Sequence, residues 1–110
     1  MSVETNNLKW FTYTQMLVGK RYKINDKIAH YVLIQANNFS DANNIAERIG
    51  IYFEGSDDNR DCRCCGDRWF RNFESGDSVP KINGDTVDIN NNTVTLTDGK
   101  EFRVHPFGSI

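Results

Sequence analysis

The chain has 110 residues, a formal net charge of -2, a hydrophobic fraction of 38 % and thirteen aromatic residues. This length predicts a single domain, 1–110, whose core is large enough to fold without disulfides or a metal. The slightly acidic charge excludes a general attraction to nucleic acid or to an anionic membrane. Residues 1–7 lack a signal-peptide pattern and are expected to be flexible. The three cysteines lie too close together in sequence for ordinary disulfides, which predicts a soluble protein in a reducing cytoplasm.

The N-terminal third predicts a hairpin of two strands. Residues 8–18 mix aromatic and β-branched side chains, a composition typical of a pleated surface. Residues 19–27 form a basic connection with turn-forming residues, and residues 28–36 are apolar enough to be the second strand. We therefore expect these two strands to pair side by side.

One helix is expected next. Ser40 is a natural N-cap, and apolar side chains recur at intervals of three and four over residues 41–49. Gly50 supplies the left-handed residue that commonly ends a helix. Residues 51–53 are apolar and are expected to leave the helix as a short buried segment.

The remainder reads as a loop followed by short strands. Residues 54–66 have no periodicity, and residues 69–73 are compatible with a further strand. Asn83-Gly84 and Asp98-Gly99 are the strongest hairpin-turn signals in the chain. The four strands that these turns would join are 79–82, 86–89, 93–96 and 101–104. The predicted fold class is α+β, with one short helix and a small antiparallel sheet.

A cluster of chemically versatile residues occupies the segment from Arg60 to Arg71. It holds all three cysteines, four of the seven arginines and one of the two tryptophans. Cysteine is a soft metal ligand and a nucleophile, arginine binds phosphate in a planar geometry, and an indole ring offers a stacking face. Three kinds of site therefore compete for this segment.

The first interpretation is a pocket for an anionic or nucleotide-type ligand. Guanidinium groups make bidentate contacts to phosphate, and aromatic rings accept stacked bases. Arg68 would contact phosphate and Trp69 would stack. The other residues assigned to this pocket are Arg60, Arg63, Arg71, Asp67 and Tyr52.

The same residues also permit a purely structural interpretation. Arg68 would pair with a neighbouring aspartate, Asp61 or Asp67, and Trp69 would cover the core. Gly66 would then serve only to make a left-handed turn. The two interpretations are compatible if some arginines are paired and others are not.

The second kind of site is a zinc centre. Cys62, Cys64 and Cys65 could supply thiolates, with His105 as a further ligand. His30 is the remaining histidine, although each histidine alone is more typical of a strand or edge residue. The ligand pattern is poor, because structural zinc usually takes two separated pairs of ligands and this chain has one cluster. A metal-free protein without a cofactor is therefore the primary expectation.

The third kind of site is an enzyme. Five residues separate Cys62 from Arg68, which matches the cysteine–arginine spacing of some protein phosphatases. The context does not fit, because Asp61 and Asp67 would raise a thiol pKa and no helix-forming run follows Arg68. The sequence therefore favours a non-enzymatic protein.

The aromatic first strand suggests an oligomer. Aromatic side chains from Trp10 to Tyr13 would occupy both faces of a small sheet, and an uncovered face is costly unless a partner covers it. We therefore expect a homodimer or larger assembly. The tail from Val104 to Phe107 is expected to add an edge strand or to reach a neighbouring subunit.

A family resemblance accompanies these residues. The run from Asn38 to Gly55, followed by Asp61-Cys62-Arg63-Cys64-Cys65-Gly66-Asp67-Arg68-Trp69, resembles a family of small uncharacterised proteins encoded by tailed bacteriophages. The resemblance covers about the middle third of the chain and carries no activity. It implies a protein that works in the cytoplasm of the infected bacterial host, where it inhibits a host protein or sequesters a nucleotide signal of host defence.

Overall fold

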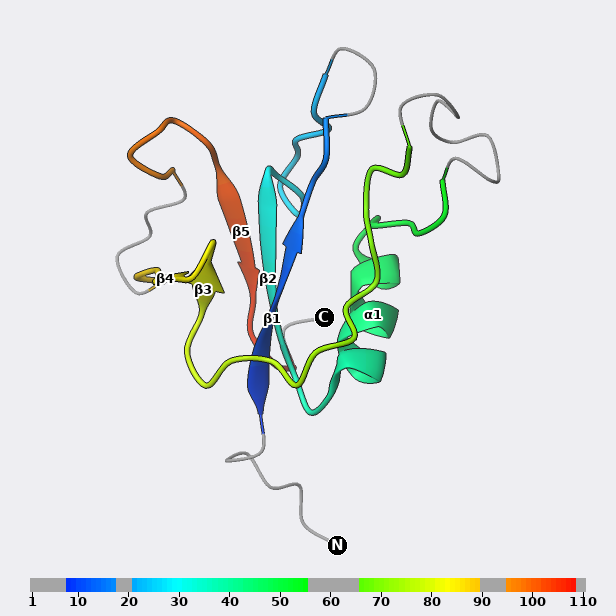
Figure 1. Cartoon of the computed structure of the whole chain (residues 1–110), viewed down its shortest axis with the longest axis vertical. Helices are drawn as coiled ribbons and strands as arrows, with labels where there is room; N and C mark the ends of the chain where they lie inside the picture. Colours follow the sequence, from blue (N-terminus) through cyan, green and yellow to red (C-terminus); the bar gives the residue numbers. More distant parts are fainter. Residues whose placement is uncertain (1–7, 18–20, 56–65, 90–94, 109–110) are drawn as a thin grey trace, which may run out of the picture.

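The computed structural model describes residues 8–17, 21–55, 66–89 and 95–108 (Figure 1). Its elements in chain order are β1 (Lys9–Thr14), β2 (Tyr31–Ala36), α1 (Phe39–Arg48), β3 (Lys81–Ile82), β4 (Asp85–Thr86) and β5 (Phe102–His105). The predicted α+β class is confirmed. Among the residues described, no helix combines the length and the apolarity that crossing a membrane requires.

The main sheet has three strands in the order β1-β2-β5. The predicted N-terminal hairpin is confirmed, because β1 pairs with β2 in antiparallel register, with Phe11 opposite Ile34. β5 lies on the other side of β2 and runs parallel to it, with Tyr31 opposite Phe102. The prediction of a purely antiparallel sheet is therefore corrected. A parallel pair requires the chain to return from the end of β2 to the level of its first residue before β5 begins. The long connection through α1 and the β3–β4 hairpin makes this return.

Alternation along the strands builds one core on each face of the sheet. The face toward α1 buries Phe11, Tyr13, Val32 and Ile34. The opposite face packs Trp10, Tyr31 and Leu33 against Ile82 and Phe102. Figure 1 shows α1 and the β3–β4 hairpin on opposite sides of the sheet. The chain itself thus covers both faces of β1, so the aromatic side chains from Trp10 to Tyr13 need no partner subunit to cover them.

α1 begins at Phe39, two residues before the start expected from the sequence. Its N-cap is Asn38, whose side-chain Oδ1 accepts a hydrogen bond from the Asp41 N–H at 2.8 Å. Ser40 lies inside the helix, so its prediction as the N-cap was wrong. The choice of Asn38 is physically reasonable, because asparagine caps as well as serine does. Gly50 follows the last helical residues with φ 108°, as predicted for a left-handed terminator.

The two predicted turns near the C-terminus are both present. Asn83 and Gly84 have φ of 53° and 86° between β3 and β4, as a tight hairpin turn requires. At the second turn Leu96 N–H donates to the Lys100 carbonyl at 2.7 Å, and Thr95 forms a bridge with Glu101. The chain then continues into β5, where Val104 and His105 belong to the edge strand that the tail predicted.

Residues 66–77, called the edge segment below, run along the free edge of β1. Met16 N–H donates to the Arg68 carbonyl at 2.9 Å, and Trp10 and Asp77 exchange two backbone hydrogen bonds of 2.7 and 2.9 Å. Between these anchors the segment has no regular strand, so the strand predicted over residues 69–73 was wrong. The segment nevertheless covers an edge that would otherwise be open to pairing with another chain.

Candidate functional site

Trp69 lies in the core rather than on the surface. Its side chain is 1 % exposed and packs in the cluster between the sheet and α1. A ring in this position has no face available to a base or another ligand. The prediction that Trp69 stacks on a ligand is therefore corrected, and the structural interpretation holds for this residue.

Arg68 is also directed inward, and it is 7 % exposed. Its Nη1 donates to Gln15 Oε1 and to the Arg21 carbonyl, each at 2.9 Å, and its Nε donates to the Tyr52 hydroxyl at 3.2 Å. These acceptors belong to three separate parts of the chain. Arg68 thus ties the end of β1 to the segment before β2, and the phosphate contact expected of it is replaced by internal acceptors.

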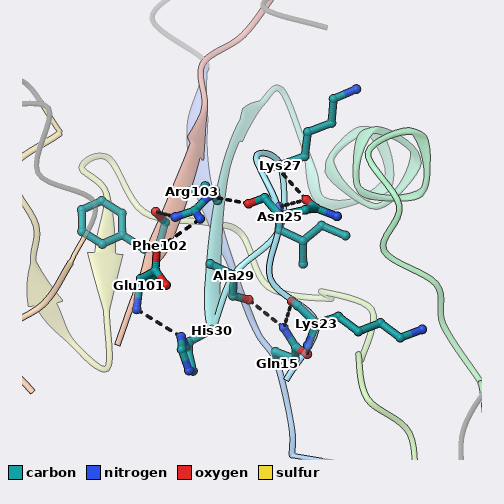
Figure 2. A network of polar contacts seen from close by, with 10 residues as sticks. Gln15, Lys23, Asn25, Lys27, Ala29, His30, Glu101, Phe102 and Arg103 are labelled. Atoms are coloured by element: carbon teal, nitrogen blue, oxygen red, sulfur yellow. Dashed lines mark hydrogen bonds and ion pairs between the residues drawn. The ribbon is translucent and has the colours of Figure 1, made fainter. Parts of the chain in front are cut away.

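Gln15 organises this buried network, and sequence analysis did not identify it as a site residue. It is 3 % exposed and continues the inward-facing series of Phe11 and Tyr13. Its Nε2 donates to the carbonyls of Lys23 and Ala29 at 2.9 and 2.8 Å, and its Oε1 accepts from the Lys23 N–H at 2.7 Å (Figure 2). A polar side chain at an inward position of an alternating strand is the signal that could have identified it.

Tyr52 belongs to the same network. It is largely buried, and its hydroxyl also accepts from Lys23 Nζ at 3.4 Å. Lys23 Nζ lies 5.0 Å from the centre of the Tyr52 ring, within the range of a cation–π contact. Tyr52 therefore supports Arg68 from inside the fold, and the ring-stacking role that the sequence suggested for it is corrected.

A second buried network fixes the middle of the edge segment. Asn43 Oδ1 on α1 accepts from the Tyr13 hydroxyl at 2.7 Å and from the Asn72 N–H at 2.9 Å, while Asn43 Nδ2 donates to the Asn72 carbonyl at 3.0 Å. Burial raises the pKa of Tyr13 well above its ordinary value, so its phenol stays neutral. The helix, the sheet and the edge segment are thus held together at one residue, Asn43.

The outer side of the edge segment is aromatic and exposed. Phe70 and Phe73 are 58 % and 72 % exposed. The Phe73 ring centre lies 5.9 Å from that of Phe39, and Met16 is also exposed nearby at the end of β1. We call this surface the aromatic face. Its members are Met16, Phe39, Phe70, Arg71 and Phe73.

Arg71 supplies the charge on this face. Its Nη1 pairs with Glu54 Oε1 at 2.7 Å, and its guanidinium carbon lies 4.9 Å from the centre of the Phe53 ring. Both partners of the ion pair reach solvent, so the pair contributes little to stability and can exchange for another anion. Of the arginines in the described part of the sequence cluster, Arg71 is the one that the fold presents outward.

Two depressions border the aromatic face. One has a volume of about 370 Å³ and lies between the end of β1 and residues 70–74. The other has a volume of about 250 Å³ and includes Glu54, Asp67 and Phe53. Phe70, Arg71 and Phe73 line both of them. The two rings and the guanidinium group therefore form a ridge between two hollows.

Comparison with known families gives one match. The model of the DUF7296 family, a domain of unknown function, matches residues 8–108. The chain belongs to this family. No curated protein and no solved structure matches it.

Several residues of the predicted site lie outside the described part of this DUF7296 domain. They are Arg60 and Arg63 of the anion pocket and Cys62, Cys64 and Cys65 of the zinc alternative. The described part of the site is thus the C-terminal half of the cluster, where Gly66 has φ 85° and the chain turns into the edge segment.

The two histidines have separate structural partners. His105 Nε2 lies 2.9 Å from the Lys27 carbonyl, and His30 Nδ1 accepts from the Glu101 N–H at 3.1 Å. Within the ranges that the structure describes, no group of three or more His, Cys, Asp or Glu residues is arranged to hold a metal. His105 is thus engaged with the backbone of the segment before β2.

Proposed function

We propose that this protein is a non-enzymatic binding protein that docks a partner protein on its aromatic face. One observation carries the proposal. The edge segment is fixed to the fold by Arg68, Trp69 and Asn72, yet it presents Phe70 and Phe73 to solvent. Exposed large apolar side chains that gather in one place are typical of interaction surfaces.

The composition of the face supports a protein partner. Aromatic residues, methionine and arginine are the types enriched at the centres of protein interfaces, and this face contains all three. The hollows on either side of the Phe70–Phe73 ridge would receive side chains of the partner. The ridge is anchored on both sides of Phe70 and Arg71, by the buried Trp69 and by the hydrogen bonds of Asn72, so less ordering entropy would be lost on binding.

The resemblance to phage proteins suggests where the partner is found. We propose a host protein in the cytoplasm of the infected bacterium, which this small protein would inhibit by covering a surface. The zinc-stabilised form of this interaction module is tested separately by the metal content of protein purified without chelator. About one zinc per chain, lost in a Cys64→Ser variant, would support it.

The experiment compares how wild type, a test variant and a control variant retain a host protein. The two variants lose exposed aromatic side chains at different places on the surface. The double variant Phe70→Ser/Phe73→Ser removes the ridge, and Phe107→Ser removes an exposed ring near the C-terminus. A host protein retained by the wild type and by the Phe107 variant, but not by the double variant, is then purified and its affinity measured by calorimetry. An interaction that survives in the double variant would contradict the proposal.

A nucleotide-type ligand is the second candidate. Arg71 stands between two exposed rings in sequence and in space, so a phosphate could take the place of the Glu54 carboxylate while a base stacks on Phe70. Thermal shifts with cyclic dinucleotides, ADP-ribose and inorganic phosphate test this candidate, and the shift should disappear in Arg71→Ala. A shift that is unchanged in Arg71→Ala would exclude this residue from the site.

A further inference from the structure

A third pocket lies at the other side of the β1 end, between β1, the start of β2 and the turn before β5. We call it the His30 pocket. Its volume is about 410 Å³, within the range of small-molecule sites. The lining residues are Thr14, Gln15, Met16, Leu17, Tyr22, His30, Tyr31 and Lys100. The proposed partner-binding function does not use it.

His30 presents a hydrogen-bond donor in this pocket. Because Nδ1 accepts the hydrogen bond from the Glu101 N–H, the proton of the neutral ring must be on Nε2. The backbone of Glu101 is itself fixed, since its carbonyl accepts from the Tyr31 N–H at 3.2 Å. Figure 2 shows His30 directed at Glu101 from the start of β2. The β2–β5 pairing therefore selects the tautomer that leaves Nε2–H for a ligand.

The charge of the pocket is positive. Among the described lining residues, Lys100 carries a charge and none is a carboxylate. The two nearest acidic residues in sequence have partners of their own: Glu101 pairs with Arg103 at 3.3 Å, and the Asp98 carboxylate accepts from the Lys100 backbone N–H at 3.0 Å. An ammonium group and an imidazole N–H in the lining of one pocket are suited to an oxyanion.

The rest of the wall is aromatic and apolar. The Tyr22 and His30 rings are in contact, with centres 4.4 Å apart and planes inclined by 55°. Met16, Leu17 and Tyr31 complete this surface. A ligand that places its charged group beside Lys100 would therefore have a hydrophobic surface for a flat ring.

We propose that the His30 pocket binds a small molecule that joins an oxyanion group to a flat ring. Lys100 Nζ and His30 Nε2–H would hold the oxyanion, and the ring of Tyr22 would contact the ring of the ligand. A nucleoside monophosphate and an aromatic carboxylate share this chemistry. The site is separate from the aromatic face, although Met16 borders both.

The test is an NMR titration that follows the His30 side-chain nitrogens. Adenosine 5′-monophosphate, benzoate, inorganic phosphate and adenosine are added separately at millimolar concentration. We expect AMP or benzoate, but neither phosphate nor adenosine alone, to move the Nε2 resonance in a saturable way. The ligand that binds more tightly identifies the oxyanion. Absence of any saturable shift at His30, or shifts confined to Phe70 and Arg71, would overturn the proposal.

Matched variants separate a built site from general charge attraction. Lys100→Ala should weaken binding roughly tenfold, the loss expected for a charge-assisted hydrogen bond. Lys27→Ala makes the same change of charge, and Figure 2 shows its side chain pointing away from His30. It should leave the affinity unchanged. Equal weakening by the two variants would overturn the proposal. A His30→Phe variant, which keeps a ring beside Tyr22 but removes the donor, should also lose binding while the far-ultraviolet circular dichroism stays that of the wild type.

Discussion

The inner and outer sides of the edge segment place neighbouring residues of similar type in opposite roles. Trp69 is buried and Phe70 is exposed; Arg68 is enclosed by acceptors and Arg71 reaches solvent. The inner residues hold the segment on the edge of β1, and the outer ones are thereby displayed in a fixed arrangement. Chemical type alone does not separate the buried from the exposed residues here, whereas the direction of each side chain does.

The largest effect on the free energy of unfolding should come from removing the buried Trp69 ring. Trp69→Ala would leave a cavity between the sheet and α1, and we expect a loss of about 3–5 kcal/mol in the free energy of unfolding. Phe70→Ala should change it by less than about 0.5 kcal/mol. Urea denaturation of both variants measures the difference. Equal losses would show that the two sides do not differ as described.

The two arginines give the next comparison. Arg68→Met removes donors from Gln15, Tyr52 and the Arg21 carbonyl, and buried acceptors left without partners should cost about 2–4 kcal/mol. Arg71→Met breaks only a solvent-exposed pair, for which about 0–1 kcal/mol is expected. The same denaturation measurement decides the case. A greater loss for Arg71→Met would reverse the assignment of inner and outer arginine.

Local sequence signals predicted much of the fold. The β1–β2 hairpin, the helix and the Asn83-Gly84 turn each follow from patterns within a few residues, where alternation, capping and positive φ act directly. The Asn38 cap was missed because serine and asparagine are equally good caps only two residues apart. The parallel pairing of β5 was missed because it depends on where a long connection returns.

The site was less predictable, for a physical reason. The edge segment has neither a helical nor a strand period, so nothing in the order Arg68, Trp69, Phe70, Arg71 indicates which side chains turn inward. That choice is made by distant partners, Gln15 for Arg68 and Asn43 for Asn72. Of the residues that the sequence assigned to a ligand in this segment, Arg68 and Trp69 are buried and Arg71 is exposed.

Tyr13 gives a smaller effect that depends on pH. Burial raises the pKa of its phenol in the folded protein, whereas an unfolded tyrosine ionises near pH 10. The contribution of this phenol to the free energy of unfolding is therefore fully present below about pH 10. It falls as the pH rises further, by up to about 1.4 kcal/mol per pH unit.

Tyr13→Phe should cost about 1 kcal/mol at neutral pH, because Asn43 keeps its bond to Asn72. The variant should also lose this alkaline slope. Denaturation at pH 9 to 11 compares the two proteins, and an identical slope in both would contradict the burial of an ionisable phenol on the inner side.

The smallest effect on stability should come from the residues with the largest proposed effect on binding. The double variant Phe70→Ser/Phe73→Ser removes two rings that are mostly in water already, so the free energy of unfolding should change by less than about 1 kcal/mol in total. Its slope against urea should match that of the wild type, because the surface exposed on unfolding is nearly the same. Loss of partner binding in a variant of unchanged stability would then be due to the removed rings alone. A fall in stability as large as that of Trp69→Ala would instead show that these rings pack against the fold, and the outer side would no longer be a free surface. The inner anchors Arg68, Trp69 and Asn72 are unchanged in this variant. The two outcomes therefore distinguish a role of Phe70 and Phe73 in binding a partner from a role in stabilising the fold.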